Sequence, residues 1–179
     1  MFVLKNETRS PAGIRFADFS SSSYSYDANA NRFSRGQCTW YVYGRIHEKL
    51  GINLQSSGSM NGGLWVKNII PKSEGGYGRI ETDINKIQEN SAASYMYESQ
   101  ASSGSRGYYG HIIFIELVER DQYGNPTYVY YSEANANGDG KVSSDDGQFK
   151  KLSFTDFKKL FQNRTPQPGE PIFQGYIQF

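Results

Sequence analysis

Residues 111–136 constrain the fold more than any other part of the chain. HIIFIELVER (111–120) is largely apolar, TYVYYSEANA (127–136) is rich in aromatic residues, and DQYGNP between them is typical of a hairpin turn. Folding this hairpin about residues 122–124 predicts an antiparallel pair in which residue 111 faces residues 134–136.

Further segments resemble strands and helices. Val42, Ile46 and Leu50 follow one helical face, and Gly51 stands where a helix commonly ends. Ser153 has an acidic residue three positions later, which is typical of a helix start. The sequence predicts helices over about 38–50, 64–70 and 153–161, and further strands over 76–82, 91–98 and 171–179.

Length and composition favour one strand-rich domain. The chain has 179 residues, of which 15% are aromatic, and 19 glycines. Together with the main helix this predicts an α+β class, with one helix against an antiparallel sheet. We expect a weakly ordered extension over residues 1–25 and a folded domain over 26–179, with no internal repeat.

Charge and hydropathy narrow the function classes. The net charge is +1, so nothing favours nucleic acid as a partner. No stretch is long enough to span a membrane, and the apolar run of MFVLKNETRSPAG is too short for a signal peptide. Export would therefore use another route, or follow removal of a leader.

Cys38 is the only cysteine of the chain, so an internal disulfide is excluded. Free cysteine commonly packs in cores as a small apolar residue. Here, however, it opens a predicted helix, where the dipole favours the thiolate. His47 lies nine positions along that helix, on its opposite side and roughly 13 Å away, which leaves His111 as the candidate base.

The hairpin brings His111 beside a polar segment. Glu133 and Asn135 are predicted to share one strand face there, because strand side chains alternate. Either side chain could accept the second imidazole N–H and fix the tautomer. Taken singly, such residues are more often structural or solvated. Together with Cys38 they form the nucleophile, base and orienting group of cysteine hydrolases.

Three segments resemble the CHAP family, the cysteine, histidine-dependent amidohydrolases and peptidases. They are GQCTWYVYGR, YYGHIIFIE and YYSEANANGDGKV, and NGGLWVKN is similar to the family's tryptophan-bearing second helix. The resemblance covers about residues 26–179 and implies a papain-like fold that hydrolyses amide bonds of peptidoglycan. It implies Cys38 as nucleophile, His111 as general base, Glu133 as the orienting group and Asn135 completing the site.

The mechanism implied by this resemblance needs an oxyanion site and a groove. The backbone N–H of Cys38 and the side chain of Gln37 are the candidate oxyanion donors. Aromatic residues near the site segments are candidates for the groove, although core packing is the commoner role, above all for the tryptophans. These candidates are Trp40, Trp65, Tyr108 and Tyr109.

Two segments have spacings compatible with calcium. One follows an EF-hand pattern but begins with Asn and ends with Asp: Asn135, Asn137, Asp139, Gly140, Val142, Ser143 and Asp146. The other lies upstream of the cysteine: Asp27, Asn29 and Asn31. A plain Gly-Asp-Gly turn is the commoner explanation of the first, and only one of the three residues of the second is charged, so we assign no metal and expect no required cofactor.

Several functions remain open at this stage. The scissile bond is either the muramoyl–L-alanine amide or a peptide bond in the stem or cross-bridge. Alternatives are an amidase of small γ-glutamyl or polyamine conjugates, and an inactive wall-binding module. We expect a monomer that acts on peptidoglycan outside the cell or in the wall, as a phage-released lysin, an excised domain or a protein targeted by a partner.

Overall fold

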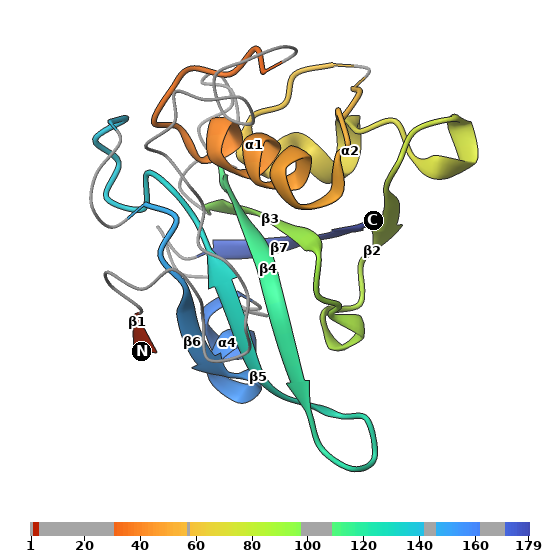
Figure 1. Cartoon of the computed structure of the whole chain (residues 1–179), viewed down its shortest axis with the longest axis vertical. Coiled ribbons are helices and arrows are strands. Elements are labelled where there is room, and N and C mark those ends of the chain that lie inside the picture. Colours follow the sequence, from red (N-terminus) through yellow and green to blue (C-terminus); the bar gives the residue numbers. More distant parts are fainter. Residues whose placement is uncertain (1, 4–30, 57, 98–108, 142–145, 162–170) are drawn as a thin grey trace.

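The computed structural model describes residues 2–3, 31–56, 58–97, 109–141, 146–161 and 171–179. Within these ranges the strands form one antiparallel sheet in the order β1-β6-β5-β4-β3-β7-β2, and helix α1 packs on one face of it (Figure 1). The predicted α+β class is confirmed, in an arrangement consistent with a papain-like fold. The strands are β1 (Phe2–Val3), β2 (Arg79–Glu81), β3 (Ser91–Tyr97), β4 (His111–Arg120), β5 (Pro126–Ser132), β6 (Lys150–Ser153) and β7 (Pro171–Gln178).

Helix α1 (Cys38–Leu50) has the predicted bounds. Its last turn is closed by Gly51, which has φ 67° and donates its N–H to the His47 carbonyl at 2.8 Å. Val42 and Ile46 on the predicted apolar face are fully buried. The local pattern therefore determines both where this helix ends and which side faces the sheet.

The other helices are short. The predicted second helix is a 3₁₀ turn, η1 (Gly62–Leu64), that runs into α2 (Trp65–Asn68). The last helix, α4 (Phe154–Phe161), follows Ser153, whose Oγ accepts the Asp156 backbone N–H at 3.0 Å. The predicted capping contact is thus present.

The hairpin of β4 and β5 has the predicted register. Phe114 pairs with Ser132, and Val118 pairs with Val129. Strand β5 ends at Ser132, however, so the expectation that Glu133 and Asn135 share a strand face is wrong. Asn135 has φ 59°, a left-handed conformation that turns the chain out of the sheet. The next strand, β6, was not predicted, because its four-residue sequence KKLS carries no clear alternation.

The core lies on both faces of the sheet, because successive side chains of a strand point to opposite sides. On β4, Ile112 and Phe114 pack with helix α1. Ile113 and Ile115 pack on the other face with residues of α4 such as Phe157. Each fully buried side chain of this kind contributes about 1.5–3 kcal/mol. Strand β4 is therefore held firmly, and His111 at its start with it.

A buried ion pair ties α1 to the sheet. Arg45 bonds both carboxylate oxygens of Glu116, at 2.9 and 3.0 Å, and also bonds Glu48 at 2.6 Å. Ser132 donates to Glu116 at 2.6 Å and accepts from Tyr41 at 2.6 Å. These hydrogen bonds satisfy the buried charges and fix the end of β5 just before Glu133.

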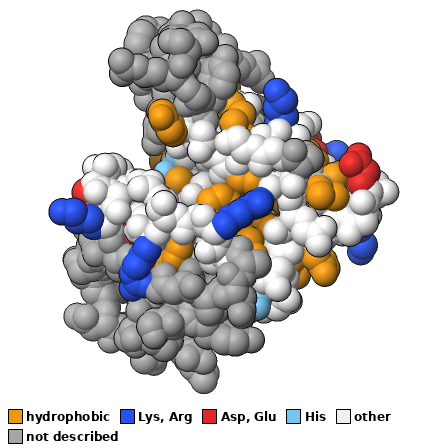
Figure 2. Space-filling model, turned by 90° about the horizontal axis from the view of Figure 1, so that it is seen from above, with side chains coloured by type: hydrophobic (Ala, Val, Ile, Leu, Met, Phe, Trp, Pro, Cys, Tyr) orange, Lys and Arg blue, Asp and Glu red, His pale blue; other side chains and the backbone are white. Residues whose placement is uncertain are grey.

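Most of the predicted extension over residues 1–25 lies outside the described residues, although residues 2–3 pair with β6. Among the helices that the structure describes, none is long and apolar enough to cross a bilayer. On the face shown in Figure 2, lysine and arginine side chains are dispersed among polar and apolar ones. This agrees with the near-zero net charge of the chain.

Candidate active site

Cys38 is the first residue of α1 and is 8% exposed. It follows Gln37, whose backbone is extended, and Gly36, whose φ is 87°. A Cβ on Gly36 would come within 2.6 Å of the Gly140 carbonyl oxygen. The backbone just before Cys38 is therefore packed directly against the loop that contains Gly140, and only glycine fits there. The thiol therefore stands at the positive end of the helix, on a backbone fixed by this contact.

His111 opens β4 beside this thiol and is 5% exposed. The imidazole and the Cys38 thiol line the same cavity and interact by charge and hydrogen bonding, and the backbones of Ile112 and Thr39 lie close enough to stabilise the thiolate as well. Burial raises the pKa of Cys38, but the charge and hydrogen bond of His111 outweigh it, and that pKa is lowered. Burial lowers the pKa of His111, but Cys38 and Glu133 hold it well above 6.5. The pair therefore favours a thiolate beside an imidazolium.

Glu133 occupies the other side of the imidazole. Its Oε2 lies 2.8 Å from His111 Nε2, so Nδ1 is the ring nitrogen that remains for the thiol. Its second oxygen, Oε1, lies 2.5 Å from the Nζ of Lys150 on β6. Burial raises the pKa of Glu133, but His111 and Lys150 together lower it. The carboxylate is thus held as an anion against the histidine.

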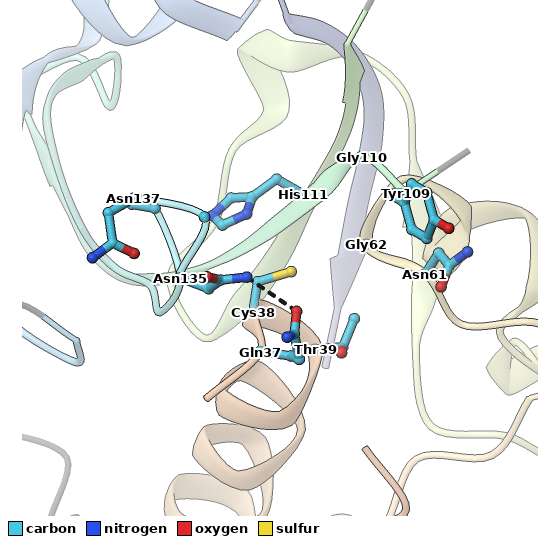
Figure 3. A pocket seen from close by; sticks show the side chains of 12 residues that line it. Gln37, Cys38, Thr39, Asn61, Gly62, Tyr109, Gly110, His111, Asn135 and Asn137 are labelled. Carbon is cyan, nitrogen blue, oxygen red and sulfur yellow. Dashed lines mark hydrogen bonds between the residues drawn. The ribbon is translucent and has the colours of Figure 1, made fainter. Parts of the chain in front are cut away.

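Asn135 contacts a different member of the site. Its Nδ2 donates to Gln37 Oε1 at 3.0 Å (Figure 3). Its Oδ1 accepts the Gly140 backbone N–H at 2.7 Å. Because the Gln37 oxygen is occupied by Asn135, its Nε2 group remains available as a donor. Asn135 therefore positions Gln37 rather than the imidazole.

Cys38 and His111 line a cavity of about 470 Å³. Tyr109 is 60% exposed at its edge, and Figure 3 shows Tyr109 and Asn61 on the opposite side from Asn137. Seven of the twelve described residues that line the cavity are glycine, asparagine or glutamine. The remaining lining residues are Gln37, Thr39, Gly62, Gly110, Asn135, Ala136 and Gly138.

A comparison with protein-family models matches residues 28–135 to the CHAP domain. The chain belongs to the CHAP family. CHAP domains are typically cysteine amidohydrolases or peptidases that act on peptidoglycan. No curated protein and no solved structure shows significant similarity to the chain.

Two of the aromatic groove candidates are wrong for this CHAP domain. Trp40 and Trp65 are 1% and 0% exposed and belong to the core. The Trp65 Nε1 donates to the Met60 carbonyl at 2.7 Å, so its polar edge is already satisfied there. Tyr109 lines the cavity as expected, and Tyr108 lies outside the described residues.

In the described part of the segment with EF-hand spacing, residues 135–141 form local turns through their own side chains. Asn137 and Asp139 bond each other, and Asp139 also accepts the Lys141 backbone N–H at 2.8 Å. The Asp146 carboxylate accepts the Asn135 N–H at 3.0 Å. Across the described part of the chain, no three His, Cys, Asp or Glu residues gather closely enough to hold a metal. Of the remaining candidates, Asp27, Asn29, Val142 and Ser143 lie outside that part.

Sequence reasoning missed three contributors to the site. Gly62 lies directly against His111, since a Cβ there would stand 2.7 Å from that backbone. Asn61 lines the cavity beside it. The paired glycines of NGGLW are the signal that could have indicated such a close approach. Lys150 has no comparable signal, because its contact depends on the pairing of β5 with the unpredicted β6.

Proposed function

We propose that this CHAP domain hydrolyses an amide bond of peptidoglycan, with Cys38 as nucleophile and His111 as general base. The observation that carries the proposal is the continuous chain of contacts from the Cys38 thiol through His111 to Glu133, beside an exposed cavity. A buried cysteine that served packing alone would have no need of a lowered pKa or of an oriented imidazole.

The reaction follows from this arrangement. The Cys38 thiolate attacks the amide carbonyl, and the oxyanion is met by the Cys38 backbone N–H and the Nε2 group of Gln37. The His111 imidazolium, held by Glu133, then protonates the leaving amine. Water, activated by the now neutral imidazole, releases the acyl group from the sulfur. Glu133 keeps the ring in one orientation through both steps.

The cavity is suited to a peptide rather than to a small enclosed ligand. Its described wall offers amide and backbone groups that can bond the main chain of an extended peptide, with Tyr109 exposed at the edge. This favours a muramoyl–L-alanine amide, or a bond of the stem or cross-bridge, over a small γ-glutamyl or polyamine conjugate. Such a substrate places the site of action outside the cell or in the wall.

The test is digestion of several peptidoglycans that differ in stem and bridge chemistry, with fragments read by mass spectrometry. New amino termini at L-alanine together with intact glycan would identify an amidase, and new termini within the stem or bridge would identify an endopeptidase. Cys38→Ala is expected to release nothing. His111→Ala should lose at least about 100-fold in rate.

The second histidine provides a matched control. His47 lies near the far end of α1, so His47→Ala should leave the rate within about threefold of the wild type. If no wall releases fragments while a thiol reagent still labels Cys38, the peptidoglycan proposal fails and the small-amide alternative takes its place.

A further inference from the structure

Glu133 has two charged partners, one on each oxygen. His111 Nε2 lies 2.8 Å from Oε2, and Lys150 Nζ lies 2.5 Å from Oε1. All three side chains are largely buried, with exposures of 6% for His111, 9% for Glu133 and 13% for Lys150. A carboxylate held at both oxygens has its plane fixed, whereas one held at a single oxygen can rotate.

The location of Lys150 makes this contact a property of the sheet. Lys150 is the first residue of β6 and pairs with Tyr131 of β5, two residues before Glu133. The neighbouring Lys151 bonds instead to Glu119, at 3.3 Å. Successive residues of a strand point to opposite sides, so the Lys151 side chain lies away from the candidate site. Of the two lysines, only Lys150 contacts the Glu133 carboxylate.

We propose that Lys150 is a positioning residue for the reaction, which holds Glu133 in the orientation that fixes the His111 imidazole. The proposal depends on the proposed function in one respect: Cys38 must act as the nucleophile and His111 as its base. It adds a fourth charged member to the site, on a strand outside the residues 28–135 matched to the CHAP domain.

The charges around Glu133 give this role a measurable signature. The charged groups are His111 and Lys150, with Cys38 beyond the imidazole, and Asp146, whose carboxylate bonds the Asn135 backbone. Tyr131 on β5 is titratable but uncharged, because burial raises its pKa. If Lys150 acted only as a nearby positive charge, its removal would raise the pKa of both Cys38 and His111, because less positive charge would oppose the proton.

If Lys150 positions Glu133, its removal has a different effect. The imidazolium loses a well-placed carboxylate, so the His111 pKa falls while the Cys38 pKa rises. The pH range in which the thiolate and imidazolium coexist then narrows from both ends. We expect narrowing by about one pH unit, which is a tenfold loss in the ion-pair equilibrium.

Two measurements are made between about pH 4 and pH 10: the rate of Cys38 alkylation by iodoacetamide, whose rise with pH reports the Cys38 pKa, and the NMR titration of the His111 ring, which reports the His111 pKa. Cys38 is the only cysteine of the chain, so the rate reports one sulfur. Lys150→Met is expected to narrow the pH range in which the thiolate and the imidazolium coexist. Lys150→Arg should keep the wild-type range, and so should Lys151→Met, which is the matched control. Should K150M not fold, K150Q supplies the uncharged variant.

Two results would overturn the proposal. One is an upward shift of both pKa values in K150M, which makes Lys150 a bystander charge. The other is a profile for K150M that matches the wild type. Because alkylation needs no peptidoglycan, the proposal on Lys150 can fail or stand whichever substrate the domain cleaves.

Discussion

Replacement of Gln37 by alanine tests the oxyanion site most directly. Gln37 immediately precedes α1, and its side chain makes no capping hydrogen bond to the helix. Its Oε1 is instead bonded by Asn135 at 3.0 Å, which leaves the Nε2 group as a donor beside Cys38. The Gln37→Ala variant therefore removes one oxyanion donor without uncapping the helix.

The two expected magnitudes differ widely. Loss of one preorganised oxyanion donor typically costs about 100- to 1000-fold in kcat, or about 2.7–4 kcal/mol of transition-state stabilisation. Loss of one partly buried hydrogen bond costs only about 0.5–1.5 kcal/mol of folding free energy. In a chain of this size that is a fall in Tm of about 1–6 °C. We therefore expect Gln37→Ala to lower kcat strongly and Tm only slightly.

The assay measures fragment release from peptidoglycan under saturating substrate, with thermal unfolding in parallel. Gln122→Ala is the matched control, because Gln122 is exposed in the β4–β5 turn, away from the cavity. Asn135→Gly removes the bond to Gln37 while permitting the positive φ of 59°, so it should give a smaller loss in kcat. A kcat for Gln37→Ala within about threefold of the wild type would refute the oxyanion role.

Two further predictions concern pH and stability. Because the pKa of Cys38 is lowered and that of His111 is raised, activity should rise through an acid limb below the ordinary thiol value of 9.0 and fall through an alkaline limb above 6.5. If activity instead depended on pH through a single pKa near 6.5, Cys38 and His111 would not form a thiolate–imidazolium pair. Glu116→Gln should lower the free energy of unfolding by about 3 kcal/mol, which is the low end for a broken buried ion pair. The low end applies because Arg45 still has a carboxylate partner in Glu48, at 2.6 Å. A loss of that size corresponds to a fall in Tm of about 6–12 °C.

The matched control for the stability measurement is Glu119→Gln. Glu119 pairs with Lys151 at 3.3 Å but is 40% exposed, and surface pairs of this kind contribute about 0–1 kcal/mol. A fall in Tm for Glu116→Gln no larger than that of the control would mean that the buried pair does not hold α1 to the sheet.

Much of the fold follows from local patterns. The spacing of Val42 and Ile46 and the glycine after Leu50 determine α1, and the β4–β5 turn determines the register that brings residue 111 towards residues 133–135. These features depend on interactions between near neighbours in sequence, so they can be read without knowledge of the rest. The proximity of Cys38 to His111 was inferred from chemistry and from resemblance rather than from geometry.

Other features could not be read in this way. Asn135 was expected to help orient His111, but it contacts Gln37, 98 positions away in sequence. The tryptophans flanking the site segments were groove candidates, but they face the core because α1 and α2 turn them inward. In each case the direction of a side chain depends on which elements pack against its own.

By itself, the sequence determined the α+β class, the start and end of α1, the hairpin register and the residues capable of thiol chemistry, because periodicity, capping and turn preferences act over a few residues. Only the tertiary structure decided that Glu133 binds His111 with one oxygen and Lys150 with the other. That contact needs β5 and β6 to pair, and pairing between strands is set by the packing of the whole sheet rather than by either segment alone.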